Sequence, residues 1–92
     1  MKQEQAVALA QDALIWLAGR SEALEGLLAA SGAAPGEVRA RAADPEFLGF
    51  VLDHLLQSDA LVLAFARDAG VSPDSPMRAR AALPGGYARD WT

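Results

Sequence analysis

The chain has 92 residues, of which 52% are hydrophobic and 22% are charged, and its formal net charge at pH 7 is −4. This length suits one hydrophobic core, because two half-length domains would each bury too little apolar surface. The sequence contains no cysteine, which excludes disulfides and sulfur-based zinc sites. The negative charge disfavours general attraction to nucleic acid or anionic membranes, since both need a positive protein field.

No segment of the sequence is typical of a membrane span or a signal peptide. The longest apolar runs, such as residues 60–66, are far shorter than the roughly 20 apolar residues of a transmembrane helix. Glu4 and Asp12 interrupt the first apolar stretch, and no small-residue cleavage site follows it. We therefore expect a soluble cytoplasmic protein without a membrane partner.

The first half of the chain predicts three helices. Apolar residues recur on one helical face between about residues 2 and 18, and Gly19 ends this segment. Ser21 is the expected cap of a shorter helix that stops at Gly32. A third short helix is expected over residues 35–43, because proline fits the first helical position.

The most clearly defined helix begins at Pro45. Asp44 is suited to cap it, and Glu46 favours the positive end of the helix. Its apolar residues cover about half of the helix circumference. They are Phe47, Leu48, Val51, Leu52, Leu55 and Leu56. We expect this helix, residues 45–56, to lie at the centre of the core.

A fifth helix follows after a turn of only about two residues, which requires a tight corner. Ser58 is its expected cap, and Gly70 is expected to end it in the left-handed conformation, with Val71 closing the hydrophobic contact. Every segment up to this point reads as helical. The predicted fold class is therefore all-α, a compact single-domain bundle of five or six short helices.

Two stretches of the chain carry helix-start and helix-stop residues in the same order. SEALEGLLAASGAAPGEVRARAADP, from Ser21, and SDALVLAFARDAGVSPDSPMRARAALP, from Ser58, both contain a cap, Ala-Leu, a glycine stop, a proline start, Arg-Ala-Arg-Ala-Ala and a proline. One interpretation is two copies of a three-helix unit, each burying its apolar face on the other. The alternative is a chance similarity between two alanine-rich helix corners.

The predicted domain covers residues 1–83, and a C-terminal tail covers residues 84–92. The tail sequence PGGYARDWT combines helix breakers with too few apolar residues to fold independently. Tyr87 and Trp91 either dock this tail onto the helices or leave it mobile.

The stretch ARDAGVSPDSPMRAR, from Ala66 to Arg80, shares features with a helix-turn-helix. In that motif the second helix enters the DNA major groove and must also place an apolar side chain in the core, a role that falls here on Pro76. A proline at that position displaces or shortens the helix. If this reading holds, Arg78 and Arg80 are the expected nucleic-acid contacts, but the flanking acids make nucleic-acid binding the second choice.

No catalytic, cofactor or metal site is predicted. His54 is the only histidine, and it lies at the edge of the apolar stripe of its helix. Its neighbour Asp53 points about 100 degrees away on a helix, so the two cannot act together. With no second histidine and no cysteine, His54 is expected to pack its ring at a boundary, and the protein is expected not to be an enzyme.

Two apolar residues fall among polar ones. Ile15 lies beside Gln11 and Asp12, and Leu63 faces outward beside Arg67. Single exposed apolar residues are ordinary, but a merged patch of several hundred square ångströms indicates a partner. Ile15, Leu63 and Arg67 are therefore the candidate partner surface.

The stretch ARAADPEFLGFVLDHLLQSDALVLAFARDAGV has two distinctive parts, DPEFLGFVLDHLL and DALVLAFA. It resembles the core of an uncharacterised family of short, all-helical alphaproteobacterial proteins, a domain of unknown function, and the resemblance covers nearly the whole chain. The resemblance implies a bacterial cytoplasmic helical protein and transfers no site residue.

These observations favour a small non-enzymatic protein-interaction module of the bacterial cytoplasm, with no cofactor. Its expected partner is another protein or a second copy of itself. The alternative is a diverged helix-turn-helix nucleic-acid binder over residues 66–80, and a weaker third class is a small-molecule-binding or catalytic protein that uses His54.

Overall fold

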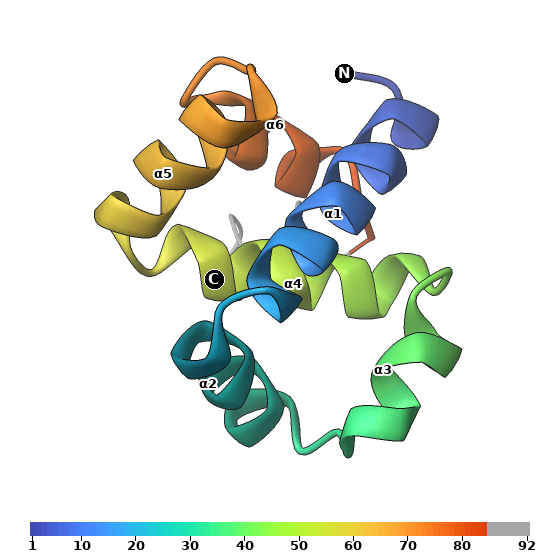
Figure 1. Cartoon of the computed structure of the whole chain (residues 1–92). Coiled ribbons are helices and arrows are strands. Elements are labelled where there is room, and N and C mark those ends of the chain that lie inside the picture. The colour runs from blue at the N-terminus through green and yellow to red at the C-terminus, as the bar shows by residue number, and fades with distance from the viewer. Residues whose placement is uncertain (85–92) are drawn as a thin grey trace.

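Six helices follow one another in the computed structural model, which describes residues 1–84 (Figure 1). They are α1 (Gln3–Ala18), α2 (Ser21–Ser31), α3 (Pro35–Arg41), α4 (Pro45–Leu56), α5 (Asp59–Ala69) and α6 (Ser75–Ala81). All regular secondary structure within these residues is helical, so the predicted all-α class is confirmed. Apart from Pro84, the predicted C-terminal tail, including Tyr87 and Trp91, lies outside the described residues.

Short polar side chains and glycines set several of the helix boundaries where the sequence predicts them. The Asp44 carboxylate accepts a hydrogen bond from the Glu46 amide at 3.0 Å, and the Ser58 hydroxyl accepts one from the Leu61 amide at 3.2 Å. Gly70 ends α5 with a φ of 70°, a left-handed conformation that glycine adopts without a steric penalty. These caps fix where α4 and α5 begin and where α5 ends.

Two predicted helix boundaries are wrong. Ser21 does not cap α2: the helix already begins at Ser21, because the Arg20 carbonyl accepts the Leu24 amide at 2.9 Å and so starts the hydrogen-bond series one residue earlier. α3 ends at Arg41 rather than at residue 43, because the Ala42 amide bonds to the Arg39 carbonyl at 3.3 Å and tightens the last turn.

α4 occupies the centre of the bundle. It packs against α1, α2, α5 and α6, and α1 crosses it closely in Figure 1. Four of its predicted core side chains are fully buried: Leu48, Val51, Leu52 and Leu55. The apolar stripe predicted from the sequence is therefore the stripe that forms the core.

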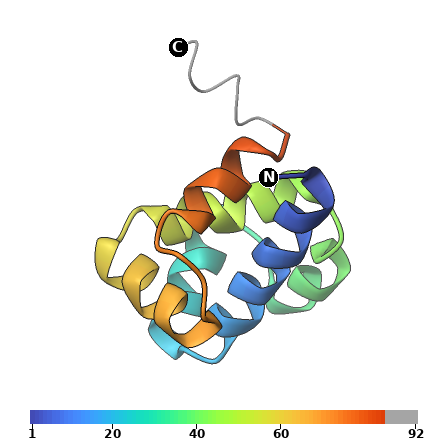
Figure 2. The same ribbon diagram turned by 90° about the horizontal axis from the view of Figure 1, so that it is seen from above.

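α1 contributes small residues where it meets α4 and α6. Ala6, Ala10 and Ala13 have no exposed surface, and all three lie on one face of the helix. Small side chains allow two helix axes to approach closely, so α1 packs tightly against both neighbours. Figure 2 shows α6 beside the N-terminal end of α1.

α6 is tied to α4 through Arg80. Its Nε donates a hydrogen bond to Oδ1 of Asp53 at 2.7 Å, and its Nη1 donates one to the Pro84 carbonyl at 3.0 Å. The guanidinium lies across Gly49, where an added Cβ would approach Nη1 to 2.9 Å. The Arg80 side chain is only 13% exposed, so it forms part of the packing between α4 and α6.

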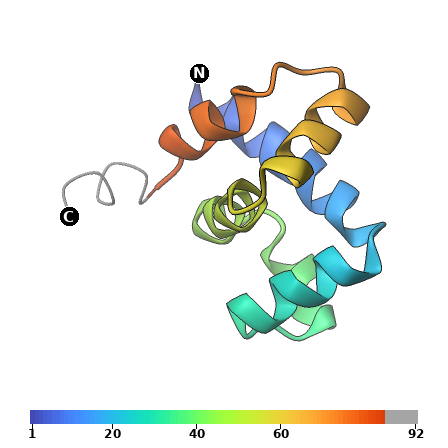
Figure 3. The same cartoon turned by 90° about the vertical axis from the view of Figure 1, so that its left-hand side faces the viewer.

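The two similar stretches adopt the same order of helices but differ in packing. α2 and α5 each have 11 residues, α3 and α6 each have 7, and Gly32 and Gly70 end the longer helices with φ values of 72° and 70°. α6 buries Ser75, Pro76 and Ala79, whereas α3 buries none of its residues. Figure 3 shows α2 and α3 on the opposite side of α4 from α5 and α6. α3 therefore lies farther out from the core than its counterpart.

Taken singly, none of the helices within residues 1–84 has both the length and the hydropathy needed to cross a membrane. α4 and α5 meet that criterion only as a pair, across a bend of 112°.

Truncating the central stripe should be costly. Leu52→Ala is expected to lower the free energy of unfolding by about 2 to 5 kcal/mol, because Leu52 has no exposed surface and its neighbours cannot fill the cavity. Leu63→Ala removes the same atoms from a side chain that is 58% exposed, and is expected to change stability by about 0.5 kcal/mol or less. Urea unfolding followed by circular dichroism measures both, and equal losses would contradict the assignment of the core.

Truncation of the two arginines of α6, one largely buried and one exposed, should also differ in its cost to stability. Arg80→Ala removes the charged hydrogen bond to Asp53 and is expected to cost about 1.5 to 3 kcal/mol. Arg78→Ala changes an exposed residue and is expected to cost no more than about 0.5 kcal/mol. Thermal unfolding of the two variants under one buffer condition compares them directly. A stable Arg80→Ala protein would show that Arg80 does not hold α6 on α4.

Candidate functional site

Ile15 is the most exposed large apolar residue within residues 1–84. Its exposed fraction is 72%, although it lies on α1, the helix that supplies Ala10, Ala13 and Leu14 to the core. Two hollows flank it, one between α1 and α5 and the other between α1, α2 and α3. Ile15 lines both hollows and therefore forms a ridge between them.

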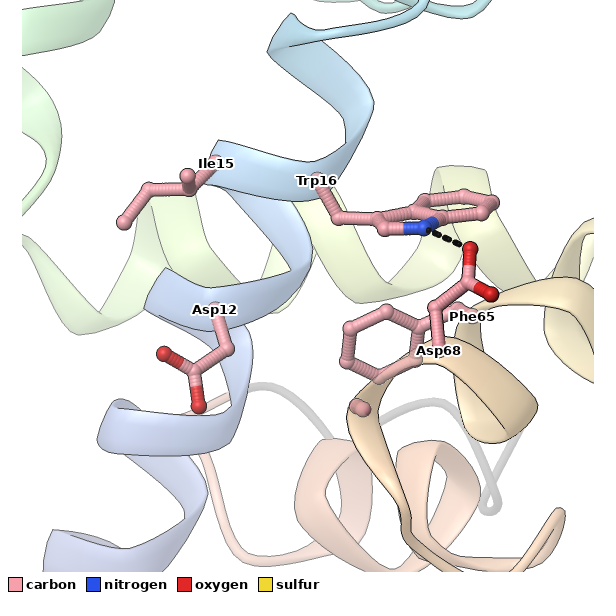
Figure 4. Close-up of a pocket in the computed structure, with 6 residues that line it drawn as sticks. Asp12, Ile15, Trp16, Phe65 and Asp68 are labelled. Atoms are coloured by element: carbon pink, nitrogen blue, oxygen red, sulfur yellow. Dashed lines mark hydrogen bonds between the residues drawn. The ribbon is translucent and has the colours of Figure 1, made fainter.

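The hollow between α1 and α5, which we call the Trp16 pocket, has a volume of about 280 Å³. It is lined by Asp12, Ile15, Trp16, Phe65, Asp68 and Ala69 (Figure 4). The indole Nε1 of Trp16 donates a hydrogen bond to Oδ2 of Asp68 at 2.8 Å. The rings of Trp16 and Phe65 pack edge to face, with centroids 5.6 Å apart and an interplanar angle of 70°. These contacts fix the wall of the pocket.

Asp68 is held by several donors at once. Besides Trp16, the Arg20 guanidinium approaches its carboxylate to 3.4 Å and Arg67 Nε approaches it to 3.3 Å. Arg20 also lies over the indole ring, 4.1 Å from the centroid, in a cation–π contact. The hydrogen bond from Trp16, followed by Arg67 and Arg20, lowers the pKa of Asp68 below its ordinary value of 3.8. Asp68 is therefore an ionised anchor between α1 and α5.

Asp12 differs from Asp68 in its surroundings. It lines the Trp16 pocket one turn before Ile15 and is exposed. It makes no hydrogen bond or ion pair with any residue among 1–84. A cation that enters from outside can therefore pair with Asp12 without breaking an existing contact.

The hollow between α1, α2 and α3, which we call the α3 groove, has a volume of about 350 Å³. Its lining is mostly apolar and comprises Leu14, Ile15, Ala18, Leu24, Leu28, Pro35, Val38, Arg39 and Ala42. The groove exists because α3 buries none of its residues in the core. The carboxamide of Gln11 donates a hydrogen bond to the Ala42 carbonyl at 2.9 Å, which fixes the end of α3 against α1. Arg39 lines the groove, is exposed, and has no ion-pair partner within the described residues.

The structure separates the three residues of the predicted partner surface. Ile15 lies between the two hollows, and Arg67 contacts Asp68 at the edge of the Trp16 pocket. Leu63 is 58% exposed on α5 but lines neither hollow. Sequence reasoning missed the groove-lining residues Leu24, Leu28 and Val38, because their helical spacing reads as an ordinary core stripe. The two leucines and the valine are only partly buried.

His54 lies at the junction of α4 and α2. A Cβ at Gly26 would approach its Cε1 and Nε2 to 3.3 Å, so the ring packs against the α2 backbone. Its Nδ1 is buried and has no hydrogen-bond partner within the described residues. Among residues 1–84, no three histidine, aspartate or glutamate side chains are grouped as a metal site would require.

The corner from Ala66 to Arg80 places its second helix in a structural role. α6 begins at Ser75, with Asp74 at the N-cap position, and spans seven residues. Pro76 is buried, as expected for the apolar position of this helix. Of the two candidate nucleic-acid contacts, Arg78 is exposed, whereas Arg80 is bonded to Asp53. Nothing in this geometry favours the nucleic-acid alternative.

The fold and site define a class: a small all-α domain with an apolar ridge between two hollows. The chain belongs to the family described as Protein of unknown function (DUF3572), whose model matches residues 3–86. This match confirms the resemblance to a domain of unknown function that the sequence suggests. No curated protein and no solved structure matches the chain.

The pKa of Asp68 gives a pH-dependent signal at the Trp16 pocket. Because that pKa is lowered in the folded protein, the stabilisation from ionised Asp68 is present above the ordinary value of 3.8 and is lost as the pH falls through the folded value. In a Trp91→Phe background, which leaves Trp16 as the only tryptophan, Trp16 emission is expected to change below pH 3.8.

Two further variants control this titration. Asp68→Asn should abolish the change in emission, whereas Asp12→Asn should preserve it, because Asp12 does not contact the indole nitrogen. A titration that survives Asp68→Asn would contradict the assignment.

Proposed function

We propose that the protein is a non-enzymatic protein-interaction module that docks a partner on the surface formed by Ile15, the Trp16 pocket and the α3 groove, hereafter the Ile15 surface. The observation that carries the proposal is the position of Ile15. An exposed branched apolar side chain stands between two hollows that are themselves partly apolar. Contiguous exposed apolar surface of this kind is typical of interaction sites on small proteins.

Covering Ile15 supplies a driving force for binding. Full burial of an isoleucine side chain is worth about 1.5 to 3 kcal/mol. Partial exposure of Leu24, Leu28 and Val38 adds apolar area in the α3 groove that a partner can also cover. The proposed partner is therefore a protein surface with an apolar side chain at its centre.

The charges at the edges of the Ile15 surface define the partner further. Asp12 on one side and Arg39 on the other have no ion-pair partner within the described residues. A matching surface places a basic group opposite Asp12 and an acidic group opposite Arg39. Charges arranged in this way fix orientation and specificity more than they add affinity.

The polar groups of the site suit recognition better than catalysis. The Asp68 carboxylate already accepts hydrogen bonds from Trp16, Arg20 and Arg67 and is held in the ionised form, so it is a poor proton acceptor. In this proposal the protein acts in the bacterial cytoplasm.

A photo-crosslinking amino acid at position 15 tests the proposal in the cells that express the protein. We expect a discrete protein adduct from position 15, and none from position 63, which has similar exposure outside the Ile15 surface. Val38→Glu places a charge in the α3 groove and should abolish the adduct, whereas Met77→Glu, which changes an exposed residue of α6, should leave it unchanged. An adduct that ignores Val38→Glu, or no adduct at all, would contradict a docking role for this surface.

A further inference from the structure

We propose that the partner of the Ile15 surface is a second copy of this chain, joined through a two-fold axis; this inference rests on the proposed function. The observation behind it is that the surface carries both an acidic and a basic group, so two copies of the same surface can pair with each other. Ile15 lies between an acidic group, Asp12, and a basic group, Arg39, each without an ion-pair partner within residues 1–84. In a two-fold interface the same patch meets itself, so Asp12 of each copy faces Arg39 of the other.

The spacing of Asp12 and Ile15 along α1 lets the apolar contact of Ile15 and the ion pair of Asp12 form together. Asp12 precedes Ile15 by one helical turn on the same side of the helix, and Arg39 lines the α3 groove beside Val38. When Ile15 of one copy enters the α3 groove of the other, its Asp12 comes to the rim of that groove, where Arg39 lies. Each copy inserts one isoleucine and receives one, and two ion pairs form at the edges.

The α3 groove is space beside α1 that the helices of this chain leave unfilled. The helix at the corresponding position of the other similar stretch, α6, buries Ser75, Pro76 and Ala79 and packs against both α1 and α4. α3 has the same length but has no fully buried residue, and the groove of about 350 Å³ remains beside α1. An apolar side chain from a second copy fills space that α3 leaves open beside α1.

The local charge also favours a second copy. The chain as a whole carries a net charge of −4, so two copies repel each other over most orientations. The charged residues that line the two hollows are Asp12, Asp68 and Arg39, and Asp68 is already paired with Arg20 and Arg67. The remaining two charges, Asp12 and Arg39, are of opposite sign, so a second copy can pair with both of them at this face.

The association should be weak, because a patch of this size belongs among the smaller interfaces. We expect a dissociation constant on the order of 100 micromolar at physiological ionic strength. Sedimentation equilibrium of the purified full chain, from about 10 micromolar to about 1 millimolar, covers this range.

Charge reversal tests the pairing. Asp12→Arg places two arginines opposite each other at both edges, and Arg39→Asp places two aspartates there, so each variant alone should dimerise at least about tenfold more weakly. An equimolar mixture of the two variants forms attractive pairs at both edges and should recover an affinity within about threefold of wild type. Both residues are exposed, and circular dichroism checks that each variant is folded.

A matched mixture controls for net charge. Asp12→Arg mixed with Arg78→Asp has the same total charge as the mixture above, but Arg78 lies on α6, outside the Ile15 surface. This mixture should not recover the wild-type affinity, because one edge still carries two arginines. Equal recovery in both mixtures would overturn the proposed pairing.

A wild-type protein that stays monomeric at about 1 millimolar would also overturn the proposal, whether residues 85–92 or another protein then cover the groove. The proposed function would survive that result if the crosslinker at position 15 still gave a Val38→Glu-sensitive adduct with a different protein. Dimers that form equally well in wild type and in both charge-reversal variants would overturn the proposal as well.

Discussion

Burial of α4 is the constraint on which the rest of the structure depends. Leu48, Val51, Leu52 and Leu55 are enclosed on every side, and a domain of this size has a net stability of only about 5 to 10 kcal/mol. The alanine face of α1 lets α4 and α6 approach, and Arg80 secures α6 over Gly49. These contacts hold α6 against α1 and α4, so Ser75, Pro76 and Ala79 of α6 are buried.

The stretch that contains α2 and α3 packs less closely than the stretch that contains α5 and α6, and the candidate site follows from that difference. α3 is held to α1 by the Gln11 hydrogen bond to Ala42 but has no fully buried residue, so apolar side chains of α1 and α2 stay partly exposed beside it. On the other side of Ile15, the contact of Trp16 with Phe65 and Asp68 braces α1 against α5 and shapes the second hollow. The Ile15 ridge is thus supported on both sides by ordered packing, as a preorganised docking surface requires.

Local signals in the sequence were sufficient for most of the fold. Asp44, Ser58 and Gly70 mark helix ends through hydrogen bonds or backbone freedom that act within a few residues, and the periodicity of residues 45–56 predicts the core helix. The ion pair of Arg80 with Asp53 and the exposure of Leu24, Leu28 and Val38 depend on contacts between distant segments. The α3 groove could not be predicted, because both similar stretches carry the same Arg-Ala-Arg-Ala-Ala sequence and only the tertiary packing distinguishes Ala40, which is exposed, from Ala79, which is buried.

The environment of Ile15 in solution is the most direct test of this account, and the sequence makes it accessible because Ile15 is the only isoleucine. Selective labelling of the isoleucine δ1 methyl group gives one NMR signal for the centre of the surface. With a soluble paramagnetic probe, the account predicts strong broadening at about 20 micromolar protein and protection at about 1 millimolar, where the copies associate. A methyl signal that is protected even at a concentration where sedimentation shows only monomer would show that Ile15 is covered within a single chain, and would contradict an open docking surface.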